Sequence, residues 1–125
     1  MRFNAGIVTD KMSETKEFYT QVLGFEVHFE NEFYLLLGSK DGSQLSFLLP
    51  DHPSQQPLFR PAFTGKGVYL TIDVEQVDEV YAAIKAKGIV PEIEIRDEPW
   101  GDRHFAIVDP NGVGIDIVTF SAPAG

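Results

Sequence analysis

Hydrophobic residues recur along the chain with two spacings, one typical of helices and one typical of strands. The order of the segments with each spacing predicts the secondary structure. Apolar positions at helical spacing predict one helix over Met12–Leu23 and a second over Val74–Lys87. Each helix is followed by a glycine, Gly24 or Gly88, the residue that takes the left-handed position after a helix without strain. Asp73, with Gln76 three residues later, resembles a capping box for the second helix.

Short apolar or alternating segments surround both helices and predict strands. One such segment precedes each helix and three follow it. The expected strands are Phe3–Val8, Phe25–Glu30, Phe33–Leu37 and Gln44–Leu49 in the first half, and Gly67–Ile72, Ile89–Ile95, Arg103–Val108 and Gly114–Phe120 in the second.

The predicted order is therefore β-α-β-β-β, written twice. Asp41-Gly42 and Asn111-Gly112 mark matching hairpin turns in the two halves. We expect a single α+β domain over residues 1–125, with module one at 1–50, a linker at 51–65 and module two at 66–121. Prolines 53, 57 and 61 favour the linker assignment.

Composition and charge exclude several function classes. The chain has 125 residues and no cysteine, so disulfides, thiolate nucleophiles and cysteine-bound metals are excluded. The net charge of −9 would repel nucleic acid and anionic membranes, whereas it would attract a cationic ligand. Because no apolar run is long enough to span a bilayer and residues 1–4 lack a signal-peptide core, we expect a cytoplasmic protein.

The repeated module and several short motifs resemble the vicinal-oxygen-chelate superfamily, which includes glyoxalase I, extradiol dioxygenases and bleomycin-resistance proteins. The matching segments are Val8–Asp10, Phe18-Tyr19, Leu23–Phe25, Pro99–Phe105 and Asp109–Gly112. The resemblance implies strongly curved, mostly antiparallel sheets around a cleft, with the helices outside. It also implies a homodimer.

Enzymes of this superfamily usually hold a divalent metal with His, Glu or Gln from the first and last strands of each module. By the resemblance, these four positions fall here at Phe3, Ser46, Val68 and Asp116. Phe3 and Val68 cannot bind a metal, and Ser46 is a poor ligand, so Asp116 alone is competent. We therefore expect no metal and no other cofactor, and instead a ligand-binding cleft lined by these four residues.

Three further residues are candidates for ligand binding. Trp100, in a loop, could stack on a planar ligand or else cover the core edge or a subunit contact. Arg103 could bind a carboxylate or pair with neighbouring acids. His104 could contact a ligand, act as a general base or be a hydrogen-bonded structural histidine. Asp116 could anchor a ligand or be satisfied by backbone donors or a nearby base.

Three functions fit these features. The first is a metal-free protein of the bleomycin-resistance type, which sequesters a cationic or planar small molecule in an aromatic cleft at a dimer interface. The second is a glyoxalase-like lyase, isomerase or dioxygenase with a displaced site, using His104, Asp116 and Glu94. The third is a non-catalytic dimeric scaffold or regulator. A fold by itself does not choose among them.

Overall fold

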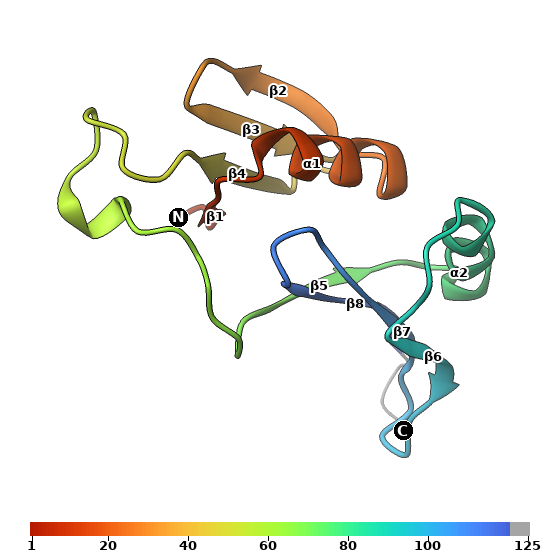
Figure 1. Ribbon diagram of the computed structural model, residues 1–125. Coiled ribbons are helices and arrows are strands. Elements are labelled where there is room, and N and C mark those ends of the chain that lie inside the picture. Colours follow the sequence, from red (N-terminus) through yellow and green to blue (C-terminus); the bar gives the residue numbers. More distant parts are fainter. Residues whose placement is uncertain (121–125) are drawn as a thin grey trace. The chain divides into compact units, whose positions relative to one another are not determined.

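The computed structural model describes residues 1–120, and its chain divides into two compact units, Met1–Thr64 and a second that begins at Gly65. Each unit contains one β-α-β-β-β module with its own four-stranded mixed sheet (Figure 1). The predicted α+β class is thus confirmed. The expected end of module two, at residue 121, lies outside the described residues.

Module one begins with β1 (Ala5–Val8), followed by α1 (Met12–Glu17), which continues as the π-helical turn η1 (Phe18–Val22). The strands β2 (Glu26–Glu30), β3 (Tyr34–Gly38) and β4 (Gln44–Leu48) complete the sheet in the order β1-β4-β3-β2. Only the β1–β4 pair is parallel. A 3-10 turn, η2 (Pro57–Phe59), lies in the segment that leads to module two.

Module two repeats this plan. It contains β5 (Tyr69–Asp73), α2 (Val77–Ala86), β6 (Ile93–Asp97), β7 (Arg103–Val108) and β8 (Gly114–Thr119). The sheet order is β5-β8-β7-β6, with β5 parallel to β8. Among residues 1–120, no helix is both long and apolar enough to cross a membrane.

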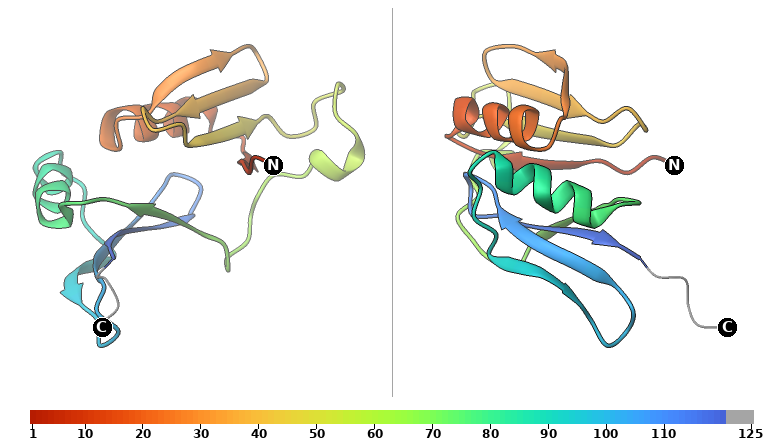
Figure 2. Two further views of the ribbon diagram at one scale, coloured as in Figure 1. Left: turned by 180° about the vertical axis from the view of Figure 1, so that it is seen from behind. Right: turned by 90° about the vertical axis from the view of Figure 1, so that its right-hand side faces the viewer.

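In each module the helix covers one face of the sheet, and the core lies between them (Figure 2). In module one, the buried Tyr19 ring packs 5.2 Å from Phe47, centroid to centroid. In module two, Tyr81 of α2 meets the buried Phe105 edge-on at 5.0 Å. Side chains alternate along a strand, so every second residue points away from the helix. We call the face of each sheet that the helix does not cover the open face of that module.

Several predicted element ends differ from the structure. β1 begins at Ala5 and β5 at Tyr69, so Phe3 and Val68 precede their strands. The strand predicted over Ile89–Ile95 is found at Ile93–Asp97. Pro91 explains part of this shift, since proline has no N–H to donate to a neighbouring strand.

The predicted capping box of the second helix is wrong. α2 begins at Val77 after Gln76, and neither side chain forms that box. The cap comes from β8 instead. The Thr119 hydroxyl accepts a hydrogen bond from the Val77 N–H at 3.1 Å and donates one to the Val74 carbonyl at 2.8 Å. A residue 42 positions away thus fixes the start of the helix.

Replacing Thr119 with valine is expected to lower the free energy of unfolding by about 1–2 kcal/mol. Valine has nearly the same shape but leaves the Val77 N–H and the Val74 carbonyl without this partner. Urea denaturation measures the change. Thr119→Ser is the matched control and should remain close to wild type, because it keeps the hydroxyl. Equal losses in both variants would show that the methyl group, not the cap, matters.

Candidate ligand-binding site

Three strands of module two bring ionisable side chains together on its open face. Buried Phe105, Ile107, Ile115 and Ile117 face α2, so His104 and Asp116 face the other way. Register places Arg96 of β6 opposite His104 of β7, and Asp116 of β8 opposite Ala106. Together with Glu98, which follows β6, the residues Arg96, His104 and Asp116 form what we call the histidine cluster.

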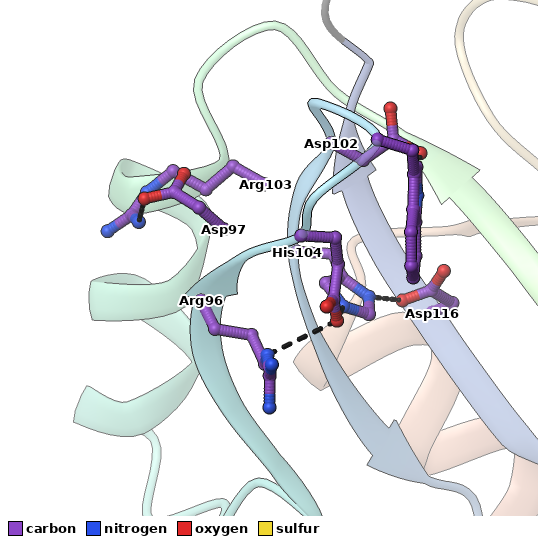
Figure 3. A network of polar contacts seen from close by, with 8 residues as sticks. Arg96, Asp97, Asp102, Arg103, His104 and Asp116 are labelled. Atoms are coloured by element: carbon purple, nitrogen blue, oxygen red, sulfur yellow. Dashed lines mark hydrogen bonds and ion pairs between the residues drawn. The ribbon is translucent and has the colours of Figure 1, made fainter.

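His104 lies at the centre of the histidine cluster and contacts a carboxylate with each ring nitrogen. Its Nδ1 is 2.6 Å from Oδ1 of Asp116, and its Nε2 is 2.6 Å from Oε2 of Glu98 (Figure 3). The same Oε2 is 3.2 Å from Nε of Arg96. The side chains of His104 and Glu98 are only 13% and 12% exposed, and that of Asp116 is 32% exposed. Solvent therefore screens these contacts weakly.

This geometry calls for a proton on both ring nitrogens. A neutral imidazole has only one N–H. Its other nitrogen would then place a lone pair against a carboxylate oxygen, which is repulsive. The hydrogen bond with Asp116, and then that with Glu98, raise the pKa of His104 above its ordinary value of 6.5, against the opposing effect of burial. The cluster is therefore best described as an imidazolium bridging two carboxylates.

The loop that begins at Glu98 carries the only tryptophan of the chain. Glu98 N–H donates to the Asp102 carbonyl at 2.8 Å, and Gly101 N–H donates to the Glu98 carbonyl at 2.9 Å. Pro99 suits the second position of such a turn, and Gly101 supplies the positive φ of 105° that closes it. The indole of Trp100 is thus presented at the tip of a tight hairpin loop.

The side chain of Trp100 is 70% exposed and makes one hydrogen bond. Its indole Nε1–H donates a 2.9 Å hydrogen bond to Oδ2 of Asp102. An exposed indole has a flat apolar face that is available to stack on another molecule. Of the roles considered for Trp100, a cover over the core edge does not fit this exposure.

Arg103 does not join the histidine cluster. It lies on the α2 side of the sheet, where it pairs with Asp97 at 3.2 Å (Figure 3). It also pairs with Asp78 of α2 at 2.9 Å. These partners raise the pKa of Arg103, and in return Arg103 lowers the pKa of Asp78. Each of the three guanidinium nitrogens of Arg103 donates to a carboxylate, Nε and Nη2 to Asp78 and Nη1 to Asp97. Arg103 therefore links α2 to the β6–β7 hairpin rather than acting as an anion receptor.

The four positions that correspond to the superfamily's metal ligands do not fit a divalent metal. Phe3 and Val68, which are 91% and 56% exposed, offer only carbon. Ser46 makes a long, 3.5 Å hydrogen bond to the Ala5 carbonyl, and Asp116 is committed to His104. Within residues 1–120, no three His, Cys, Asp or Glu side chains are placed to hold a metal together.

Glu98 and Arg96 were not predicted as members of the histidine cluster, nor was Asp78 predicted as the partner of Arg103. The register of β6 is interrupted by a bulge between Ile93 and Arg96, so alternation along the strand does not predict which residue meets His104. Glu94, expected beside His104 in the enzyme hypothesis, lies on the other face, where it accepts a hydrogen bond from the Tyr81 hydroxyl.

The open face of module two also carries exposed side chains outside the histidine cluster, toward the end of the sheet at Gly114. By register with Gly114 and Ala106, the residues Tyr69, Ile93 and Val108 share this face, and they are 72%, 43% and 40% exposed. Exposed apolar side chains that share one face are typical of a surface that contacts a ligand or another chain.

The sequence relatives of the chain are bleomycin-resistance proteins. The chain is 31% identical over 102 residues to a protein of that name from Geobacillus stearothermophilus, covering 75% of this chain and 77% of the relative. The bleomycin resistance protein of Staphylococcus aureus matches to the same extent.

Solved structures show the same fold. A glyoxalase/bleomycin resistance protein/dioxygenase from Nocardioides matches with a TM-score of 0.80 at 19% identity, over 100% of this chain and 87% of that one. A bleomycin-binding protein complexed with bleomycin matches with a TM-score of 0.71 at 23% identity, over 97% and 99%. A lactoylglutathione lyase from Agrobacterium tumefaciens matches with a TM-score of 0.78 at 19% identity, over 95% and 92%.

At these identities the solved structures speak to the fold alone, and the family assignment rests on the sequence. The family model of the Glyoxalase/Bleomycin resistance protein/Dioxygenase superfamily matches residues 3–117, which is nearly the whole chain. The motifs that suggested this resemblance are spread over the same residues. The chain therefore belongs to the glyoxalase/bleomycin resistance protein/dioxygenase superfamily.

Proposed function

We propose that this protein binds a small molecule of the bleomycin type and sequesters it without chemical conversion and without a metal. The observation that carries the proposal is the loop from Glu98 to Asp102 in module two, which presents the exposed Trp100 and whose first residue belongs to the histidine cluster. The likeness to bleomycin-resistance proteins, at 31% identity, supports the same class of ligand.

Charge favours a cationic and planar ligand. The loop that carries Trp100 and the histidine cluster together hold three carboxylates, those of Glu98, Asp102 and Asp116, and two cations, Arg96 and protonated His104. The whole chain adds a net charge of −9, which draws a cation toward the protein over a distance set by the salt concentration. The flat face of an indole is itself attractive to a cation or an aromatic ring.

The cleft and the second subunit belong to the proposal as well. One open face exposes Tyr69, Ile93 and Val108 to water, an area that a second copy of the chain would cover. We propose a homodimer in which such faces enclose the ligand, with Phe3, Ser46 and Val68 contributing to the lining. Bound ligand would then be withdrawn from its target in the cell.

The enzyme alternative is less well supported by the geometry. A general base needs a nitrogen available to the substrate, and both nitrogens of His104 already contact carboxylates. If the protein were a lyase or dioxygenase using this site, His104→Ala and Asp116→Ala would abolish turnover of a suitable substrate while leaving the fold intact.

Binding of bleomycin is expected to raise the melting temperature of the protein. A ligand at about 100 times its dissociation constant adds about 2.7 kcal/mol, which corresponds to a shift on the order of 10 °C for a chain of this size. Differential scanning fluorimetry with metal-free bleomycin measures the shift, and an anionic planar compound of similar size is the control. An unchanged melting temperature at millimolar bleomycin would contradict the proposal.

A further inference from the structure

Glu98 belongs both to the loop that carries Trp100, through its backbone, and to the histidine cluster, through its side chain. It is the first residue of the loop that presents Trp100. Its N–H donates to the Asp102 carbonyl, and its carbonyl accepts from the Gly101 N–H. Its side chain, 12% exposed, is held at Oε2 by both Arg96 and His104. A carboxylate buried to this extent between two cationic groups couples the loop to the sheet behind it.

We propose that Glu98 is a positioning residue for Trp100: through His104 it fastens the loop from Glu98 to Asp102 onto β7 and β8, and so sets where the indole meets an aromatic ligand. The identity of the ligand in this inference rests on the proposed function. The coupling between Glu98 and Trp100 does not depend on it.

The backbone holds the loop mainly through β7, whose first residue, Arg103, pairs with Thr119 of β8, whereas the β6 side of the loop is paired less regularly. β6 is an edge strand, and a bulge interrupts its pairing with β7 between Ile93 and Arg96. Beyond the bulge, register continues only at Arg96 and Asp97 before the chain turns. The side-chain bridge from Glu98 through His104 to Asp116 adds a connection from the loop across β7 to the central strand β8.

The coupling depends on the proton of His104. The groups that face this ring are Arg96 from β6, Glu98 from the loop and Asp116 from β8, while the charges of α2 lie on the other face, where Asp78 meets Arg103. Loss of one ring proton turns one attractive contact with a carboxylate into a repulsive one. The indole should therefore change its surroundings as His104 deprotonates.

Trp100 fluorescence tests the coupling directly, because the chain has one tryptophan. In the free protein we expect a single fluorescence transition above pH 6.5, the ordinary pKa of histidine, and His104→Gln should abolish it. Glu98→Gln should move the transition to lower pH by about one unit, since it removes one of the charges that favour the imidazolium. Glu94→Gln, the same change in β6 but on the α2 side of the sheet, is the matched control and should leave the transition in place.

The bleomycin titration completes the test. At pH 6, Glu98→Gln should bind bleomycin about tenfold more weakly than wild type, and Glu94→Gln should bind it as wild type does. An unaltered fluorescence transition in Glu98→Gln would overturn the positioning role. Absence of bleomycin binding in wild type, with the transition shifted as expected in Glu98→Gln, would overturn the proposed function and leave the positioning of Trp100 standing.

Discussion

Replacing His104 with leucine is expected to lower the free energy of unfolding by about 2 kcal/mol at pH 6. Leucine is of similar size, so little packing is lost. The cost arises because the carboxylates of Glu98 and Asp116, at 12% and 32% exposure, lose the imidazolium between them. Urea denaturation of both proteins at one ionic strength gives the difference.

The difference in the free energy of unfolding between wild type and His104→Leu should become smaller as the pH rises. The pKa of His104 is raised in the folded protein, so folding favours the protonated ring. Its stabilising effect is complete below the unfolded pKa of about 6.5 and is lost as the pH rises through the folded pKa. The wild type should therefore approach His104→Leu in stability at alkaline pH, and a difference that stays constant from pH 6 to pH 9 would contradict the imidazolium bridge.

A triple variant supplies the control for this prediction. His104→Leu combined with Glu98→Gln and Asp116→Asn removes the two carboxylates along with the ring between them. A buried ionic group replaced as a whole often costs little, whereas removal of one partner leaves the others uncompensated. The triple variant should recover most of the loss seen in His104→Leu. Failure to recover would mean that the ring is needed for packing.

Replacing Trp100 with alanine is expected to weaken bleomycin binding by about 10- to 100-fold while changing stability little. The side chain is 70% exposed, so its loss leaves no cavity in the core. Trp100→Phe should keep a large part of the affinity, because it preserves a stacking surface. Phe59→Ala, an exposed aromatic in η2, is the control and should bind as wild type does. Equal affinity of Trp100→Ala and wild type would remove the indole from the site.

The repeated module was predictable because local signals agree with one another. Helical spacing of apolar residues, strand alternation and a glycine after each helix all indicate the same order of elements, and Gly24 and Gly88 indeed take positive φ values. The faces of β7 followed from the same alternation: Phe105 and Ile107 are buried, and His104 lies opposite them.

The partners of the site residues were harder to predict, because they depend on contacts between distant parts of the chain. Asp78 meets Arg103 from 25 residues away, and Thr119 caps a helix 42 residues earlier. The bulge in β6 also decides that Arg96, not Ile95, lies opposite His104. Asp116, expected either to anchor a ligand or to be satisfied by backbone donors or a nearby base, contacts such a base, His104.

Comparison of the two modules shows that module one has other residues at the positions of His104 and Asp116. Register gives Ser46 in module one the place that Asp116 has in module two, next to β1 and β5 respectively. In the same way Tyr34 takes the place of His104, opposite Leu48 and Val118. Neutral side chains thus occupy in module one the positions that carry charge in module two. The open face of module two is accordingly the better candidate for recognising a cation.

Calorimetric titration of metal-free bleomycin into the chelator-treated protein shows whether the protein sequesters the drug without a metal. We expect saturable binding that does not change when zinc, nickel, manganese or ferrous iron is added to the protein beforehand, with unaltered bleomycin recovered afterwards. Absence of saturable heat at millimolar drug, binding that appears only after the protein is loaded with metal, or recovery of a chemically altered drug would contradict the proposed function.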